Sequence, residues 1–328
     1  MARAAGQLNW TGAKNSKRSL MGWSDGCFST VGQVFLKPKC QRKEDRAMSA
    51  WVSQSSLSDD SAFLDMHDHL PVSLIMTHRR DWATCTPEMS VSEIPEEHRI
   101  FSFLPVVDQN AKIIIDGQEF HATIGLFHQD RYAGKHEKIG DYYTPIGENN
   151  LIASNASILD YVLQAQDHQC CLIASGYHMR GLVSLSDLQQ LPVRAALFGL
   201  VTGLEQLMIE VINNKQIGQK DWISLISAGR QKKVKDLISE SLVEDAYVDP
   251  LLFTQLCDKF DIIQKAKVLE LSKVAFNKKA KPIKKLRDDL AHANEFANSP
   301  KSAANTSETV NVIIEFRNEL VSAMGSNT

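Results

Sequence analysis

The spacing of apolar residues changes near Leu188, and this change divides the chain into two structural classes. Between about residue 70 and residue 187, short apolar and β-branched runs alternate with turn residues, which is typical of strands and hairpins. From Leu188 onward apolar residues recur every three or four positions, which predicts helices. The longest stripe is Leu197, Leu200, Val201, Leu204, Leu207, Met208, Val211 and Ile212. We therefore expect an α+β fold with strands first and an all-α bundle after them.

The same spacing predicts the other helices of the second half. Pro192 suits a first helical turn, and further helices are expected over 220–227, 230–243, 250–274, 282–297 and 308–323. A polar loop rich in Ser, Ala and Asn is expected over Asn298–Ser307. Because no flexible linker follows Asp187, a continuous helix would place that residue about 27 Å from Glu205.

The strand-rich half contains an internal repeat. At an offset of 67 residues, Val72–Thr77 aligns with Ile139–Thr144, and Leu104–Val107 aligns with Cys171–Ala174. Ser90 and Val91 align with Ser157 and Ile158 at the same offset. The offset then falls to 56, which pairs Ile124–Phe127 with Arg180–Val183. The first copy therefore carries eleven extra residues (67 − 56 = 11), within Asp108–Thr123.

Each copy has the order strand, helix, strand, turn, strand, helix. Ser157 is a good N-cap for the helix of the second copy, whereas Pro95 should shorten or distort the helix of the first. The opening Val-x-x-Ile-Met-Thr and the closing Gly-Leu-Val-Ser-x-x-Asp resemble the CBS domain tandem, or Bateman module. This resemblance implies two βαββα units over 58–191, with copies at about 70–131 and 139–191.

The CBS resemblance implies an adenosine site in the second copy. In that family a Ser/Thr-x-x-Asp sequence holds the ribose, and Ser184 and Asp187 match it. Arg180 and His178 could face phosphates. The first copy has His128 and Arg131 at the matching positions, so we expect one nucleotide site rather than two. The other reading of Ser184 and Asp187 is an ordinary helix N-cap, and the two roles are compatible.

The helical half carries a second candidate site near residue 290. His292 lies almost opposite the apolar stripe of its predicted helix, one turn after Asp288, with Arg287 beside them. Arginine offers a permanently charged fork for phosphate, and histidine exchanges protons near neutral pH. These are the groups needed for metal-independent cleavage of RNA by its own 2′-hydroxyl. The alternative reading is a solvated helix face, because such pairs also occur by chance.

The spacing of Arg287, Asp288 and His292 resembles the signature of the HEPN family of all-helical ribonucleases, in which two protomers bring their motifs into one cleft. The resemblance implies a HEPN-like bundle over 192–328. Glu205, on a Leu-Glu-x-Leu sequence, is similar to residues on the first HEPN helix, and Arg287 is its expected partner. From Lys265 to Arg287 there are nine basic residues and one acid, Glu270, which is a footprint for a phosphate backbone. Any single lysine there could equally be solvated.

Composition bears on the cellular location, on membrane spans and on metal sites. The chain has 328 residues and a net charge of −3, and its six cysteines show no zinc-ligand spacing, so reduced thiols in a cytoplasmic protein are expected. We expect no membrane span, no export signal and no metal site; Asp65, His67, Asp68 and His69 are interpreted as a polar lead-in. Residues 1–57 are basic and predicted to be disordered, either as a nucleic-acid tail or as an extension ahead of a start at Met48.

Together these patterns predict a protein that senses an adenine nucleotide and cleaves RNA without a cofactor. His292 would be the general acid/base, Arg287 the phosphate stabiliser and Asp288 the residue that orients His292 or the partner motif. We expect a homodimer with RNA and an adenosine nucleotide as partners, and no membrane. The alternative is a non-catalytic regulator whose bundle only dimerises or docks a partner.

Overall fold

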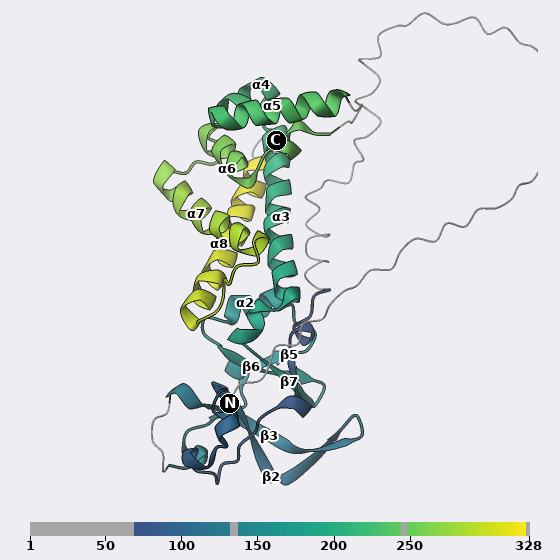
Figure 1. Cartoon of the computed structure of the whole chain (residues 1–328), viewed down its shortest axis with the longest axis vertical. Helices are drawn as coiled ribbons and strands as arrows, with labels where there is room; N and C mark the ends of the chain where they lie inside the picture. Colours follow the sequence, from purple (N-terminus) through teal and green to yellow (C-terminus); the bar gives the residue numbers. More distant parts are fainter. Residues whose placement is uncertain (1–68, 132–136, 244–247, 326–328) are drawn as a thin grey trace, which may run out of the picture. The chain divides into compact units, whose positions relative to one another are not determined.

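A computed structural model describes residues 69–131, 137–243 and 248–325 of the chain (Figure 1). The predictions for the tail 1–57 and for Asp65, His67 and Asp68 lie outside these residues. All the described residues belong to one compact unit. The α+β fold class, with tandem strand-rich units followed by helices, is confirmed.

The second copy of the repeat has the complete expected order of elements. It contains β5 (Leu151–Ala153), α2 (Ile158–Gln164), β6 (Cys170–Ser175), β7 (His178–Ser184) and the 3-10 helix η9 (Leu185–Gln189), after the short elements η7 (Ile139–Asp141), β4 (Thr144–Pro145) and η8 (Glu148–Asn150). The hydroxyl of Ser157 accepts the Leu159 amide, and Asp160 accepts the Ser157 amide, which completes a capping box. The predicted N-cap at Ser157 is thus confirmed.

The first copy has a single parallel bridge, between Cys85 and Val106, where the second copy has the strand β5, and it has no α-helix among its described residues. Its elements are η2 (Val72–Leu74), β1 (Thr77–His78), η3 (Arg79–Asp81), η4 (Val91–Glu93), η5 (Glu96–His98), β2 (Phe103–Ile115), β3 (Gln118–His128) and η6 (Gln129–Arg131). Pro95 separates two single turns of 3-10 helix, as expected from its missing N–H group. The extra residues lengthen the β2–β3 hairpin into a ribbon, which turns at Asp116 and Gly117, both at positive φ.

The two copies exchange their first strands, and the exchange follows the predicted offsets residue by residue. β1 joins the sheet β1-β7-β6-β5, where Thr77 faces Leu182. β4 joins the sheet β2-β3-β4, where Thr144 faces Leu126, so the two registers are related by 67 and 56 residues. The same symmetry relates the hydrogen bond from the Val72 amide to the Ala156 carbonyl to the one from Ile139 to Met89. The sequence repeat is therefore a structural pseudo-twofold.

Glycine is required where each exchanged strand crosses the other copy. A Cβ atom on Gly181 would lie 2.7 Å from Met76 Sδ and 2.8 Å from the Thr77 carbonyl oxygen. The equivalent Gly125 faces the Thr144 carbonyl and the Tyr143 ring even more closely. Side chains at these two positions would push the exchanged strands away.

The helical half differs from the prediction at several boundaries. It contains α3 (Leu191–Asn214), α4 (Gln219–Leu225), α5 (Ala228–Val243), η10 (Pro250–Phe253), α6 (Leu256–Lys265), α7 (Lys273–Ala291) and α8 (Pro300–Gly325). The expected helix 250–274 is therefore two shorter helices. α7 begins nine residues earlier than predicted, contains Pro282, and ends at Ala291 rather than residue 297. The expected loop Asn298–Ser307 was wrong, because α8 starts at Pro300.

The second copy and the helices share one hydrophobic core. Ile158, Tyr161 and Ile173 belong to the same buried cluster as Leu204 and Phe316. α3 and α8 pack along each other in Figure 1, and α2 packs on both. By length and composition α3 could also cross a membrane, but its buried side chains lie in this shared core. The first copy has a separate small core around Leu104, Val106 and Phe127.

Candidate functional site

A cavity of about 580 Å³ lies between the two copies and the helical half. The first copy contributes the end of β1 and the start of β2, including Thr77, Trp82 and Phe103. The second copy contributes the end of β7 and the start of η9, including Ser184. The segment Ala297–Pro300, which joins α7 to α8, forms a further wall. The cavity therefore touches all three parts of the described chain.

The cavity walls combine aromatic rings with polar atoms that have no partner. The Phe103 ring stacks on His128 with 4.3 Å between centroids and 3° between planes. His128 Nδ1 and Gln189 Nε2 are buried and make no hydrogen bond. Burial and the nearby Arg131 lower the pKa of His128, which favours its neutral form. Buried polar atoms of this kind usually have partners, so a polar ligand would satisfy them.

The charge of the walls restricts the ligand. Asp81, Asp130 and His128 are the titratable residues among the described residues that line the cavity, and no Lys or Arg is among them. The wall residues carry two carboxylates, of which Asp81 lies 3.6 Å from Arg80 outside the wall, and they supply no permanent positive charge for a phosphate. Such a wall disfavours a ligand that carries several phosphate groups.

Ser184 and Asp187 are close together but have different surroundings. Ser184 lines the cavity, and its hydroxyl lies 2.8 Å from that of Ser186. Asp187 is buried and is not a wall residue; it accepts the Ser184 amide at 2.7 Å and the Gln190 side-chain amide at 2.8 Å. Burial raises the pKa of Asp187, against the lowering effect of these hydrogen bonds. In this structure Ser184 is the N-cap of η9, and Asp187 is the third helical residue, whose carboxylate accepts the Ser184 amide and hydroxyl and so orients Ser184.

Arg180 and His178 lie away from the cavity. Arg180 forms an ion pair with Asp116, at the tip of the β2–β3 ribbon, and therefore connects the ribbon to β7. His178 pairs with Ser175 at the hairpin end of β7. Neither residue lines the cavity. Both were expected to face phosphates, but Arg180 instead forms an ion pair with the ribbon.

Arg287 and Asp288 lie in the last turns of α7 and His292 follows its last residue, whereas the expected helix 282–297 placed all three within the helix. Ile283, Leu286 and Leu290 are buried, whereas Asp288 and His292 are exposed. The Arg287 guanidinium lies 3.3 Å from the Asp288 carboxylate. The three residues line neither this cavity nor the groove between α7 and α8. Their face of α7 is therefore open in a single chain.

His292 is the C-cap of α7, and the turn after it is unusual. The Asn294 amide donates to the Asp289 carbonyl at 2.8 Å, and Ala293 has a φ of 53°. This is the αL cap position that glycine normally occupies, and alanine there costs about 1 kcal/mol. Ala293 falls within the expected helix 282–297, but α7 has already ended at Ala291.

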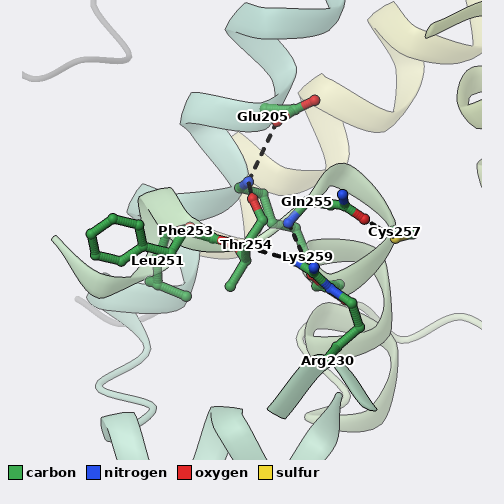
Figure 2. A network of polar contacts seen from close by, with 9 residues as sticks. Glu205, Arg230, Leu251, Phe253, Thr254, Gln255, Cys257 and Lys259 are labelled. Carbon is green, nitrogen blue, oxygen red and sulfur yellow. Dashed lines mark hydrogen bonds and ion pairs between the residues drawn. The ribbon is translucent and has the colours of Figure 1, made fainter. Parts of the chain in front are cut away.

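Glu205 does not pair with Arg287, which corrects the expected partner. Figure 2 shows that it contacts Lys259, with 3.4 Å between the carboxylate and the ammonium nitrogen. Lys259 is 2% exposed and also donates to the Thr254 carbonyl at 2.7 Å. Burial lowers the pKa of Lys259, although Glu205 opposes this effect. Asp258 beside it pairs with Arg230 at 2.7 Å, so these charges join α3, α5 and α6.

Part of the basic stretch is neutralised inside the chain. Lys279 contacts Glu315 and Glu319 on α8, and Lys285 contacts Asp289. A groove of about 760 Å³ between α7 and α8 is lined by Lys279, Lys285, Asp289 and Glu315, together with Pro282, Phe296 and Val312. The positive surface near the motif is therefore weaker than the count of lysines implied.

Arg194 is a residue that the sequence reading missed. From the first turns of α3 its Nη2 donates to the Asn294 carbonyl at 2.6 Å and lies 3.5 Å from the Ala293 carbonyl. Its guanidinium also lies 5.0 Å from the Phe296 ring centroid. The sequence placed Arg194 near the start of a predicted helix, two residues after Pro192. Nothing in the sequence indicated its contact with a residue about 100 positions later.

Several solved CBS structures are similar to this chain. The CBS domain of a bacterial CNNM/CorC family Mg²⁺ transporter in complex with ATP is 17% identical, with a TM-score of 0.31, over 40% of this chain and 92% of that one. CBSX2 in complex with AMP is 19% identical, with a TM-score of 0.28, over 39% and 96%. A hemolysin-like CBS protein of Oenococcus oeni PSU is 17% identical, with a TM-score of 0.29, over 39% and 93%. No family model and no curated protein matches the chain.

Proposed function

We propose that this protein is a cytoplasmic sensor of an adenine nucleoside or nucleotide whose helical half is a HEPN-like, metal-independent endoribonuclease. The observation that carries the sensor is the cavity of about 580 Å³ between the two repeat copies. Its size is within the range of about 300–1,000 Å³ that small-molecule sites have. The pseudo-twofold exchange of β1 and β4 makes this cavity a shared product of both copies.

The wall chemistry supports a nucleobase and a ribose. Trp82, Phe101 and Phe103 provide flat apolar surfaces for a base, and His128 Nδ1 and Gln189 Nε2 are available for its polar edge. The hydroxyls of Thr77 and Ser184 can bind ribose oxygens. Because the wall lacks basic residues among those described, adenosine or AMP fits it better than ATP.

Calorimetry with adenosine, AMP and ATP tests the sensor. We expect adenosine and AMP to bind the full chain more tightly than ATP. Ser184→Ala should weaken binding directly, and Asp187→Ala should weaken it by releasing Ser184 from its hydrogen bond. Arg131→Ala, outside the cavity wall, is the comparison variant and should leave most of the binding, since Arg131 affects the cavity only through the pKa of His128. Equal losses in Ser184→Ala and Arg131→Ala, or no binding at all, would contradict the site.

The proposed nuclease uses the open face of α7. His292 would take or give the proton of the 2′-hydroxyl and Arg287 would stabilise the phosphate, with Asp288 orienting one of them. The two key residues are about 140° apart around one helix, five positions at about 100° each. A second copy of the chain, facing this surface across a twofold axis, would enclose the scissile phosphate between the motifs. Glu205, paired with Lys259, supports the bundle rather than the reaction in this proposal.

Incubation of the purified chain with RNA in EDTA tests the nuclease. We expect cleavage to continue in the chelator and to disappear in His292→Ala without a change in thermal unfolding, since His292 is exposed. His121→Ala, an exposed histidine on the ribbon, is the matched control. A mixture of Arg287→Ala and His292→Ala chains should recover part of the activity if the motifs combine across a dimer. Cleavage that requires a divalent ion would reject the mechanism.

The second candidate is a regulator without catalysis, and one observation favours it. In a single chain Arg287 contacts Asp288 on its own helix, and the pair lies outside both cavities. Intact RNA together with measurable AMP binding would support this regulator. Sedimentation of the full chain would then show whether the exposed face of α7 forms a dimer in the absence of any RNA.

A further inference from the structure

Arg194 and Gln189 connect the candidate ligand cavity to the turn that carries His292. Gln189 is at the end of η9 and forms part of the cavity wall. Its side-chain oxygen accepts a hydrogen bond from Arg194 Nη2 at 3.2 Å. The same Nη2 donates to the Asn294 carbonyl, two residues after His292. Two side chains therefore span the distance between the two sites.

On the cavity side of this connection, one hydrogen-bond donor has no partner. Gln189 Nε2 is buried and has no partner, although its oxygen is committed to Arg194. A ligand acceptor in the cavity would complete the amide and keep its oxygen directed at Arg194. Ligand binding and the Gln189–Arg194 hydrogen bond would thus reinforce each other.

The other end holds a backbone turn that is intrinsically unfavourable. Ala293 is in the left-handed region, where a residue with a side chain is strained. Arg194 contacts the carbonyl oxygens of Ala293 and Asn294 and lies over the Phe296 ring. The chain then continues through Ala297–Pro300, which returns to the cavity wall. The segment from His292 to Pro300 is therefore held at one end by Arg194 and exposed to ligand at the other.

We propose that Arg194 and Gln189 are positioning residues that transmit occupancy of the cavity to His292. This inference rests on the proposed nucleoside site but not on nuclease activity. With ligand bound, Gln189 fixes Arg194, and Arg194 fixes the turn after His292 in one arrangement. Because coupling between two sites is reciprocal, loosening the turn must also weaken the ligand.

Calorimetry with AMP and adenosine on full-length variants measures this coupling. Arg194 does not line the cavity, so Arg194→Met can change affinity only indirectly. We expect it to weaken AMP binding by about fivefold or more, the usual range of coupling between sites. Gln189→Ala should weaken binding as well, and the double variant should be little worse than the worse single variant. Arg194→Lys, which keeps the charge but loses the forked donor, should fall between the unmodified protein and Arg194→Met.

The matched control is Lys284→Met. Lys284 lies 5.2 Å above the Phe260 ring, so its loss also removes one positive charge and one cation–π contact from the bundle. It lines neither the cavity nor the turn after His292. We expect its AMP affinity to equal that of the unmodified protein. A loss equal to that of Arg194→Met would mean that general destabilisation of the bundle, not the connection, changes affinity.

A direct readout is the ¹H–¹³C signal of the His292 imidazole, assigned with His292→Ala. AMP should move this signal in the unmodified protein and in Lys284→Met but not in Arg194→Met. If AMP binds but Arg194→Met and Gln189→Ala retain full affinity and the His292 shift, the coupling is wrong and the sensor stands. If AMP and adenosine do not bind the unmodified chain, both the sensor and the coupling are rejected. Thermal unfolding confirms that each variant is folded.

Discussion

The two repeat copies share one backbone plan but differ in what their cores contain. Copy two has a full helix, α2, whose buried Tyr161 belongs to the same core as the helical half. Copy one replaces that helix with two 3-10 turns and has a separate core around Val106. Ser307 on α8 donates to the Leu163 carbonyl of α2, a contact for which copy one has no described counterpart. The α-helix is therefore present in the copy whose core is shared with the bundle.

The first copy compensates through its long hairpin. Arg79 is buried between the Trp82 and Phe120 rings, with distances to their centroids of 5.2 and 5.4 Å. It donates to the Met179 carbonyl at 3.1 Å and to the His121 carbonyl. Arg180 and Asp116 add a second connection between ribbon and copy two. Copy two therefore contacts the bundle through an apolar helix, whereas copy one contacts copy two through polar side chains around its β-ribbon.

The strongest way to break this comparison is to open a cavity at equivalent core positions. Ile173 and Val106 are both fully buried and are related by the offset of 67. Ile173→Ala should lower the free energy of unfolding by about 3 kcal/mol and Val106→Ala by about 2 kcal/mol. Helical circular dichroism should follow the first loss much more closely than the second, because only Ile173 is in the shared core. Equal shifts of the helical transition would show that the copies unfold as one unit.

Substitution of the two crossing glycines sharpens the comparison. Gly125→Ala meets the Thr144 backbone and an aromatic ring, whereas Gly181→Ala meets the flexible Met76 side chain first. We expect losses of about 3 kcal/mol for Gly125→Ala and about 2 kcal/mol for Gly181→Ala. Urea unfolding monitored by tryptophan fluorescence measures both. A larger loss at Gly181 would indicate that the exchanged β1 strand is the more rigid one.

Removal of the caps tests whether the helix of copy two matters more than the turns of copy one. Ser157→Ala removes the acceptor for the Leu159 amide at the start of α2, which should cost about 1 kcal/mol. At the equivalent Ser90 the side chain makes no cap hydrogen bond to a backbone amide, and its hydroxyl lies 3.0 Å from that of Ser92. Ser90→Ala should therefore cost only a few tenths of a kcal/mol. Thermal unfolding of the two variants measures both losses of stability.

The smallest expected effect is the pH dependence that His128 contributes in copy one. His128 stands where copy two has Ser184, and burial together with Arg131 lowers its pKa below the ordinary 6.5. The folded chain therefore binds this proton less readily than the unfolded chain. Its contribution to stability is complete above about pH 6.5 and is lost as the pH falls toward the lowered value.

Urea unfolding at about pH 7.5 and about pH 5.5 measures this term. The loss of stability at the lower pH should be smaller in His128→Gln, which keeps a polar side chain but has no proton to bind. Ser184→Thr, which keeps the hydroxyl that Asp187 accepts, should leave the pH dependence unchanged. An identical pH dependence in all three proteins would assign it to other groups.

The repeat was readable because it depends on local patterns. Offsets of 67 and 56 residues predicted which strands correspond, and the Thr77–Leu182 and Thr144–Leu126 pairs follow them. Pro95 predicted a shortened or distorted helix in copy one, since proline removes a backbone donor wherever it stands, and the structure has two 3-10 turns there. The position of His292 off the core stripe followed from helical periodicity. Alternation, proline chemistry and helix angle are properties of short segments.

The partners of charged residues were decided only by the tertiary structure. Glu205 pairs with Lys259, Arg180 pairs with Asp116, and Arg194 reaches the turn after His292. The end of α7 also depends on a contact between distant segments. The helix ends at Ala291, and Arg194 of α3 contacts the turn that follows. Ala293 in that turn has a positive φ, which alanine disfavours. A long charged side chain can reach many partners, and packing of distant segments selects one of them. The sequence by itself determined the units and their periodicity, while the fold determined which charges meet.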